Sequence, residues 1–157
     1  MRCAKNGQAL RDKIENILGP FLQKNCFKLI KCFEEPLDFA LIIYSNDKIY
    51  LRFIYERLLV MDVGTKYSSL DWSDTDWYGL SMVFNYLTKQ SKTPDVRGLR
   101  ELWSTDTHEG RELWSTDFRL NIWTQELPEM FPIVSDYLQD DGQLKERIQA
   151  IEYWRTT

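Results

Sequence analysis

Residues Leu37–Gly64 read LDFALIIYSNDKIYLRFIYERLLVMDVG. Apolar side chains recur at every second position along this stretch, which is typical of β-strands. Two short breaks, Ser45–Asp47 and Glu56–Leu58, divide the stretch into three runs. Because loops of this length join neighbouring antiparallel strands, the sequence predicts three strands that pair in chain order.

The alternation also predicts how these strands pair. Three-residue loops match apolar residues across both hairpins, whereas two-residue loops would place Leu51 opposite Asp62. A slip of one residue moves every side chain to the other face of a sheet, so we prefer the longer loops. The predicted pairs are Ile43–Ile49, Leu41–Leu51 and Phe39–Phe53 in the first hairpin, and Tyr55–Leu59, Phe53–Met61 and Leu51–Val63 in the second.

One charged pair follows from this register. Arg52 is expected opposite Asp62, with Ala40 on its other side, on the less apolar face of the sheet. A cross-strand pair of opposite charge contributes roughly 0.2–1 kcal/mol. We interpret this pair as a structural ion pair on a half-exposed sheet, and a binding surface is the alternative.

The flanking sequence completes an α+β fold class, with an N-terminal helix, a four-stranded antiparallel meander and a helical C-terminal half. Helical spacing predicts an amphipathic helix over residues 8–24, interrupted by Gly19-Pro20, and alternation predicts a first strand over residues 27–33. A capping-box-like Ser73 and Asp76 predict a helix over residues 74–89, with Trp77 on its buried side. Leu120, Trp123 and Leu127 predict a helix that ends at Pro128, and two more helices should follow it.

The length fits a single domain over residues 1–157, with its sheet layer at about residues 26–64 and its helical region at about residues 74–156. The helical region contains a tandem duplication at residues 100–117. The heptapeptide RELWSTD occurs at Arg100–Asp106 and again at Arg111–Asp117. Two copies are too few for a solenoid, so we interpret them as a local duplication of which only one copy is needed for the core.

Composition narrows the classes of partner. The net charge of −4 argues against a nucleic-acid partner, which would require a basic surface, and leaves room for a basic protein. The chain begins without the apolar core of a signal peptide and has no stretch long enough to span a membrane. Three cysteines without metal-binding spacing are expected to be reduced thiols. We therefore expect a cytoplasmic protein with no membrane contact.

No pattern of catalytic residues stands out. The single His108 lies inside the duplicated region, which gives little support to Ser-His-Asp or Cys-His chemistry. Phosphate-binding glycine loops and metal-binding motifs are also missing from the sequence. We therefore expect no enzyme activity, no cofactor and no metal.

Aromatic and acidic residues gather after the last predicted strand, in the sequence DWSDTDWY. Trp and Tyr are enriched at interface hot spots, and acidic groups steer basic partners. Carboxylates near a helix N-terminus are the simpler explanation for the acids. The candidate partner-binding residues are Asp71, Trp72, Asp74, Asp76 and Tyr78.

The order of helix, meander and helical tail resembles the small bacterial immunity proteins of polymorphic toxin systems. The segments that carry the resemblance are Ile17–Phe27, Ile49–Gly64 and Trp77–Leu87, within about residues 17–90. The resemblance implies a cytoplasmic binding protein without catalysis, and it supplies no site residues. The duplicated RELWSTD has no expected counterpart in that family.

Two functions from different classes follow. The first is a non-enzymatic protein-interaction protein, of the immunity type that inhibits a toxin. The alternative is a small-ligand-binding or regulatory domain with a cavity between the sheet and the C-terminal helices. The sequence names neither a partner nor an oligomeric state, and a homo-oligomer is compatible with it.

Overall fold

The computed structural model describes residues 5–35, 39–56, 58–71, 73–88 and 116–156. Its strands form one antiparallel sheet in which each strand pairs with the next one in the chain, in the order β1-β2-β3-β4-β5. The strands are β1 (Lys28–Glu35), β2 (Phe39–Ser45), β3 (Tyr50–Tyr55), β4 (Leu59–Gly64) and β5 (Trp77–Gly79). The predicted meander is therefore present, with one strand more than the four expected.

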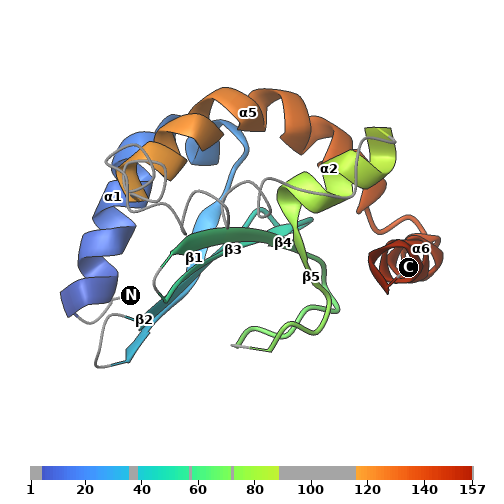
Figure 1. The fold of residues 1–157 in the computed structure, drawn as a ribbon, viewed down its shortest axis with the longest axis horizontal. Coiled ribbons are helices and arrows are strands. Elements are labelled where there is room, and N and C mark those ends of the chain that lie inside the picture. The colour runs from blue at the N-terminus through green and yellow to red at the C-terminus, as the bar shows by residue number, and fades with distance from the viewer. Residues whose placement is uncertain (1–4, 36–38, 57, 72, 89–115, 157) are drawn as a thin grey trace, which may run out of the picture.

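Helices cover one face of this sheet. They are α1 (Lys5–Lys24), α2 (Leu80–Thr88), α5 (Thr116–Tyr137) and α6 (Leu144–Thr156). Figure 1 shows α1, α5 and α2 arching over the sheet, with α5 between the other two, while α6 lies beyond β5. The α+β class with segregated layers is confirmed, because the helices precede and follow the sheet in the chain.

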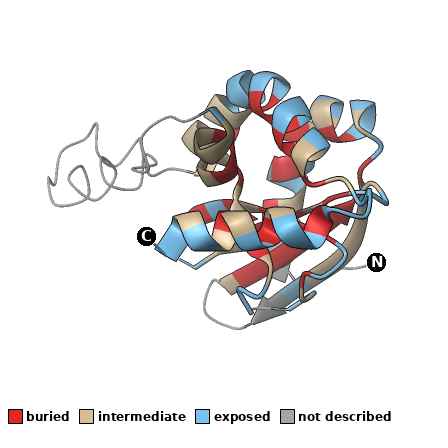
Figure 2. Cartoon of the chain, turned by 90° about the vertical axis from the view of Figure 1, so that its right-hand side faces the viewer, coloured by how far each residue is buried: buried red, intermediate tan, exposed pale blue. Residues whose placement is uncertain are grey.

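The main apolar core lies between the sheet and these helices. Ile14 and Leu18 of α1 and Leu127 and Val134 of α5 are almost fully buried against Phe53 of the sheet. Each helix turns its buried residues inward and its exposed residues outward, as Figure 2 shows. At roughly 25 cal/mol per Å² of apolar surface removed from water, this layer is the principal stabilising contact of the fold.

Helix α5 continues through two prolines, which corrects the prediction that the helix ends at Pro128. Pro128 and Pro132 both lie inside the single helix. An interior proline removes a backbone hydrogen bond and costs about 3 kcal/mol or more. Burial of Leu127, Met130 and Phe131 on the inner side of this segment offsets that cost, so packing overrides the local preference of the sequence.

The pairing predicted for the first hairpin is wrong. Tyr44 pairs with Leu51 and Ile42 with Phe53, so the turn spans residues 46–49 and Ile49 belongs to the turn. The Asn46 side-chain oxygen accepts hydrogen bonds from the backbone N–H groups of Lys48 and Ile49, which fixes this longer turn. Both faces of β2 are buried, and its hydrophobic pattern therefore could not distinguish between the registers.

The pairing predicted for the second hairpin is confirmed. Tyr55 pairs with Leu59, Phe53 with Met61 and Arg52 with Asp62. The neighbour of Arg52 on β2 is Ile43 and not Ala40, because the first hairpin has shifted. Ile43 and Arg52 consequently share the sheet face that the helices leave uncovered.

The duplicated heptapeptides lie outside the described residues, except for Thr116 and Asp117, which begin α5. Deleting Thr107–Asp117 is expected to change the free energy of unfolding by less than about 1 kcal/mol. In the deleted chain the same RELWSTD sequence precedes Phe118, so α5 keeps an Asp in its first turn. The exposed ion pair between Lys13 and Asp117, at 3.3 Å, contributes little in either case. Thermal unfolding checks this, and loss of a cooperative transition would show that both copies are needed.

The cysteines differ from the expectation that all three are reduced. Cys32 is disulfide-bonded, which corrects that expectation, and Cys26 carries a free thiol. Among the described residues no helix is long and apolar enough to cross a membrane.

Candidate functional site

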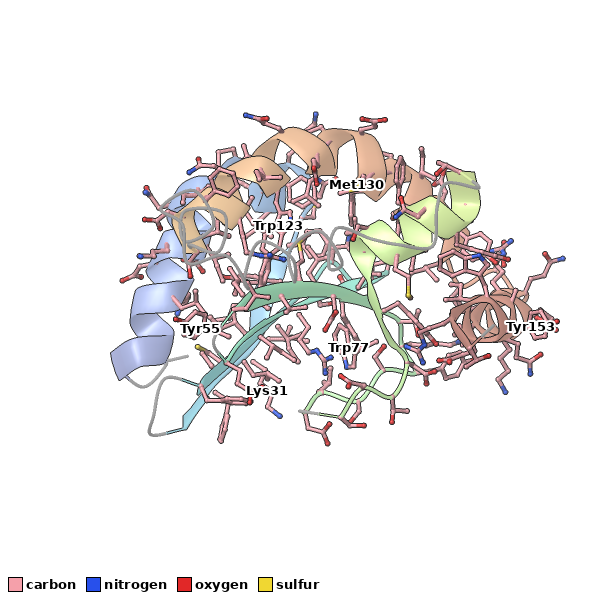
Figure 3. The ribbon with its side chains drawn as sticks, in the orientation of Figure 1. Lys31, Tyr55, Trp77, Trp123, Met130 and Tyr153 are labelled. Atoms are coloured by element: carbon pink, nitrogen blue, oxygen red, sulfur yellow. The ribbon has the colours of Figure 1, made fainter. Side chains whose placement is uncertain are left out.

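The face of the sheet opposite the helices holds a buried arginine. Arg52 projects from β3 beside Ile43 of β2 and Asp62 of β4, and its side chain has no exposed surface. Figure 3 shows Trp77 and Lys31 on this side of the sheet, with Trp123 and Met130 on the side of the helices. A segment of residues 65–71 and 73–76, which we name the acidic loop, covers Arg52.

All five N–H donors of Arg52 are used. Nε and Nη2 donate to the same carboxylate oxygen of Asp62, at 3.3 and 2.8 Å. The second N–H of Nη2 donates to the Asp74 carboxylate at 3.0 Å. Nη1 donates to the backbone carbonyls of Asp71 and Ser73, at 3.2 and 2.7 Å. The guanidinium therefore fastens three loop residues to the sheet, and its planar fork suits this task better than a lysine would.

The surroundings of Arg52 increase the strength of these contacts. The Trp77 ring lies 4.5 Å from the centre of the guanidinium, which is cation–π geometry. Burial raises the pKa of Asp62 above its usual value, and the hydrogen bonds and positive charge of Arg52 oppose that shift. Asp74 is different, because its side chain is 87% exposed and its ion pair with Arg52 is screened by water on that side.

Side-chain hydrogen bonds shape the acidic loop, and they explain why the predicted helix start is wrong. Asp71 accepts from the backbone N–H of Ser73, and the Ser73 hydroxyl accepts from that of Thr75. Such local bonds compete with helix formation. Asp76 has a φ of 57°, in the left-handed region, where a helix cannot continue. The chain then forms β5, and helix α2 begins only at Leu80.

A serine anchors the start of the loop. Ser68 is buried, and its hydroxyl accepts a hydrogen bond from the Thr65 backbone N–H at 2.8 Å and donates to the Asp76 carbonyl. The Trp77 indole N–H donates to the Ser69 carbonyl. Together with Arg52, these bonds hold the loop at its start, middle and end.

The predicted partner-binding residues differ in how far the structure exposes their side chains. The side chains of Asp71 and Asp74 lie on the surface of the acidic loop, and Asp76 is half-buried. The Asp71 carboxylate accepts from the Ser69 hydroxyl and the Ser73 N–H, and these bonds hold its pKa below the usual value. Trp72 lies outside the described residues.

Tyr78 does not reach the surface. It is 1% exposed and packs in the main core, where burial, with Glu152 beside it, raises the pKa of its phenol far above the usual value. Arg155 of α6 lies over its ring at 5.1 Å. Tyr78 is thus a core residue, because β5 turns it toward the helices and turns its neighbour Trp77 to the opposite face.

Two further residues belong to this face that sequence reasoning did not select. Leu70 of the acidic loop is 40% exposed, and the Lys31 ammonium group of β1 donates to its carbonyl. The loop therefore extends across the sheet from β4 to β1. A signal was available in the density of Ser, Thr and Asp over residues 65–76, which is typical of a loop held by its own side chains.

The acidic side chains of this face do not gather into a metal site. In the part of the chain that the structure describes, no three His, Cys, Asp or Glu side chains lie close enough together to hold a metal ion.

Comparisons of the chain with known protein families, with curated proteins and with solved structures gave no match.

Proposed function

We propose that this chain is a non-enzymatic protein-interaction protein, of the kind that inhibits a toxin by covering it, and that the acidic loop is its contact surface. The observation that carries this proposal is that Arg52 ties the loop to the sheet. Three of its N–H donors bind the loop residues Asp71, Ser73 and Asp74, and the other two bind Asp62 of β4. A surface that is already ordered loses little conformational entropy when a partner binds. A fixed loop that displays Leu70, Asp71 and Asp74 is therefore suited to recognition.

The chemistry of the loop favours a basic protein partner. The carboxylates of Asp71 and Asp74 would steer such a partner during encounter, so association should slow as salt increases. Leu70, together with Trp72, would supply the apolar contact that sets the dissociation rate. The predicted alternative, a ligand cavity between sheet and helices, would have to open an apolar core in which Phe131 contacts Phe21 and Phe27.

A pair of matched substitutions tests this assignment. Leu70→Ala is expected to weaken binding of a native partner about tenfold, which corresponds to about 1.4 kcal/mol, because it removes a central apolar contact. Ile133→Ala is the control. Ile133 is about as exposed as Leu70, at 42% and 40%, but it lies on α5, on the other side of the sheet.

The measurement is quantitative mass spectrometry of proteins retained from native lysate by each variant. A protein that the wild type and the Ile133→Ala variant retain equally, and that the Leu70→Ala variant loses, is a partner of the acidic loop. Equal retention by all three variants, or loss with Ile133→Ala alone, would place the contact surface elsewhere. Trp72→Ala is predicted to weaken the same binding by about 2 kcal/mol.

The cytoplasmic location predicted from the sequence stays a prediction. Disulfides are uncommon in reducing compartments, so the oxidation state of Cys32 is informative. Alkylation of thiols at the moment of lysis would find Cys32 reduced in a cytoplasmic protein, and oxidised in a protein from an oxidising compartment.

A further inference from the structure

An apolar row crosses the sheet next to the acidic loop. Phe33 of β1 pairs with Leu41 of β2, Leu41 pairs with Ile54 of β3, and Ile54 pairs with Val60 of β4. Residues that pair across neighbouring strands project from the same face. We name Phe33, Leu41, Ile54 and Val60 the apolar row. They lie on the face that carries Arg52.

The acidic loop covers the row of residues beside this one, and part of the apolar row remains accessible. The covered row contains Lys31, Ile43, Arg52 and Asp62, two positions along the strands or about 7 Å away. In the apolar row, Phe33 and Val60 are each 38% exposed, Ile54 is half-buried and Leu41 is fully buried. Half of this sheet face is thus protected by its own loop, and the other half offers apolar side chains to the solvent.

The apolar row and the acidic loop lie next to each other on this face of the sheet. The hydrogen bond from Lys31 to the Leu70 carbonyl holds Leu70 at β1, two positions along the strand from Phe33. Single exposed apolar residues are common on any protein, but a contiguous apolar patch with a polar rim is typical of an interaction site. We name Phe33, Ile54, Val60 and Leu70 the patch: all four present apolar surface on one side of the sheet, with charged side chains beside them.

Charges around the patch determine which partner suits it. Exposed Asp71 and Asp74 lie on the loop side, and exposed Glu56 follows β3 on the other side of the row. Of the cations in the covered row, Arg52 is paired with Asp62 and Asp74, and Lys31 donates to a loop carbonyl. Among the described residues of this face, the four acids Asp62, Asp71, Asp74 and Glu56 outnumber the two cations Arg52 and Lys31, so the balance of charge is acidic. Like charges across a contact are unfavourable. A two-fold contact with a second copy would bring these acids together.

We infer that the apolar row and the acidic loop together bind a basic amphipathic segment of a partner protein, with its apolar side chains on the row and its Lys or Arg side chains against the loop and Glu56. This inference rests on the proposed function and extends the contact surface from the loop to the sheet. It assigns Val60 and Ile54 to recognition.

The test uses a synthetic amphipathic peptide of leucine and lysine, and the matching peptide of leucine and glutamate, titrated into the isotope-labelled chain and followed by NMR. The leucine–lysine peptide is expected to shift the amide signals of residues 30–33 and 52–62 together with those of the acidic loop. Equal binding of the leucine–glutamate peptide, or shifts centred on α5, would overturn the inference.

Two opposite charges placed at one position sharpen the test. Val60→Lys is expected to weaken binding of the leucine–lysine peptide about tenfold or more, and Val60→Glu is expected to weaken it less, since only the lysine repels the peptide. This difference should shrink as salt rises. The same two substitutions at Ile133 are the control, and they should change the affinity by less than about twofold.

Further variants distinguish a loss of binding from misfolding, from a contact confined to the loop and from self-association. Val60→Thr keeps the branched side chain that suits a strand, so it should fold normally and still lose part of the affinity. If the Val60 variants fold and bind like the wild type while Leu70→Ala loses its native partner, the contact is confined to the loop, and the inference fails without the proposed function. Self-association in sedimentation that Val60→Lys abolishes would instead show that a second copy covers the row.

Discussion

Replacing Arg52 with methionine is expected to lower the free energy of unfolding by about 3–5 kcal/mol. The substitution leaves the largely buried Asp62 carboxylate without its cation, and it leaves the carbonyls of Asp71 and Ser73 without their donor. Unpaired buried charge is among the few causes of so large a loss. Urea unfolding followed by fluorescence measures it. A cost near 1 kcal/mol or less would show that the pair behaves as an exposed cross-strand pair.

Three variants separate charge from packing in this prediction. Lys13→Met removes the exposed ion pair with Asp117 and should cost less than about 0.5 kcal/mol. Arg52→Lys keeps the charge but cannot reach all four acceptor atoms, so it should still be destabilising. The double substitution of Arg52→Met with Asp62→Leu should recover much of the loss, because replacing both members of a buried pair is often close to neutral.

Gly64→Ala is expected to destabilise the protein by about 3 kcal/mol, at the upper end of the usual cost of overpacking. A Cβ at this position would lie 2.6 Å from the Ser68 hydroxyl and 2.6 Å from the nearest carbon of the Trp77 ring. Neither group can move freely, since Ser68 bonds Thr65 and Asp76 while the Trp77 ring stacks on Arg52. Chemical denaturation measures the cost.

The same substitution elsewhere in the chain is the control. Gly19→Ala lies within α1 and its Cβ would meet nothing within 4 Å apart from its chain neighbours. It should change the free energy of unfolding by less than about 1 kcal/mol, because the gain in helix propensity is opposed by the contact of the new Cβ with the ring of Pro20. Trp77→Phe removes the ring that the new methyl group would strike, so combining it with Gly64→Ala should cost less than the sum of the two single changes. Additive costs would mean that the clash is not with Trp77.

The predictions for Arg52 and Gly64 also bear on binding, because both residues keep the acidic loop ordered before a partner arrives. Arg52 and Gly64 are buried and are not themselves contact residues, yet both determine where the acidic loop lies on the sheet. We therefore expect variants that loosen the loop to lose affinity even where the contact residues are intact, because the loop must then be ordered at the moment of binding.

Local chemistry in the sequence was sufficient for several parts of the fold. Alternation predicted the antiparallel meander, and the second hairpin followed its predicted register, because Phe53 and Met61 must face the core together. Helical spacing found α1 and the α+β arrangement of layers. In each of these places the burial of one face agrees with the local pattern, so the sequence alone determined the outcome.

Tertiary structure decided the rest, for identifiable reasons. The first hairpin was mispaired because both faces of β2 are buried, and the side chain of Asn46 then set the turn. Pro128 did not end α5, because the residues around it are held in the core. Most importantly, a sequence shows that Arg52 stands opposite Asp62 but not that loop residues 19 to 22 positions farther along fold back over it. Burial converts that ion pair from a minor surface contact into the anchor of the candidate site, since the energy of a charge depends on how much water remains around it.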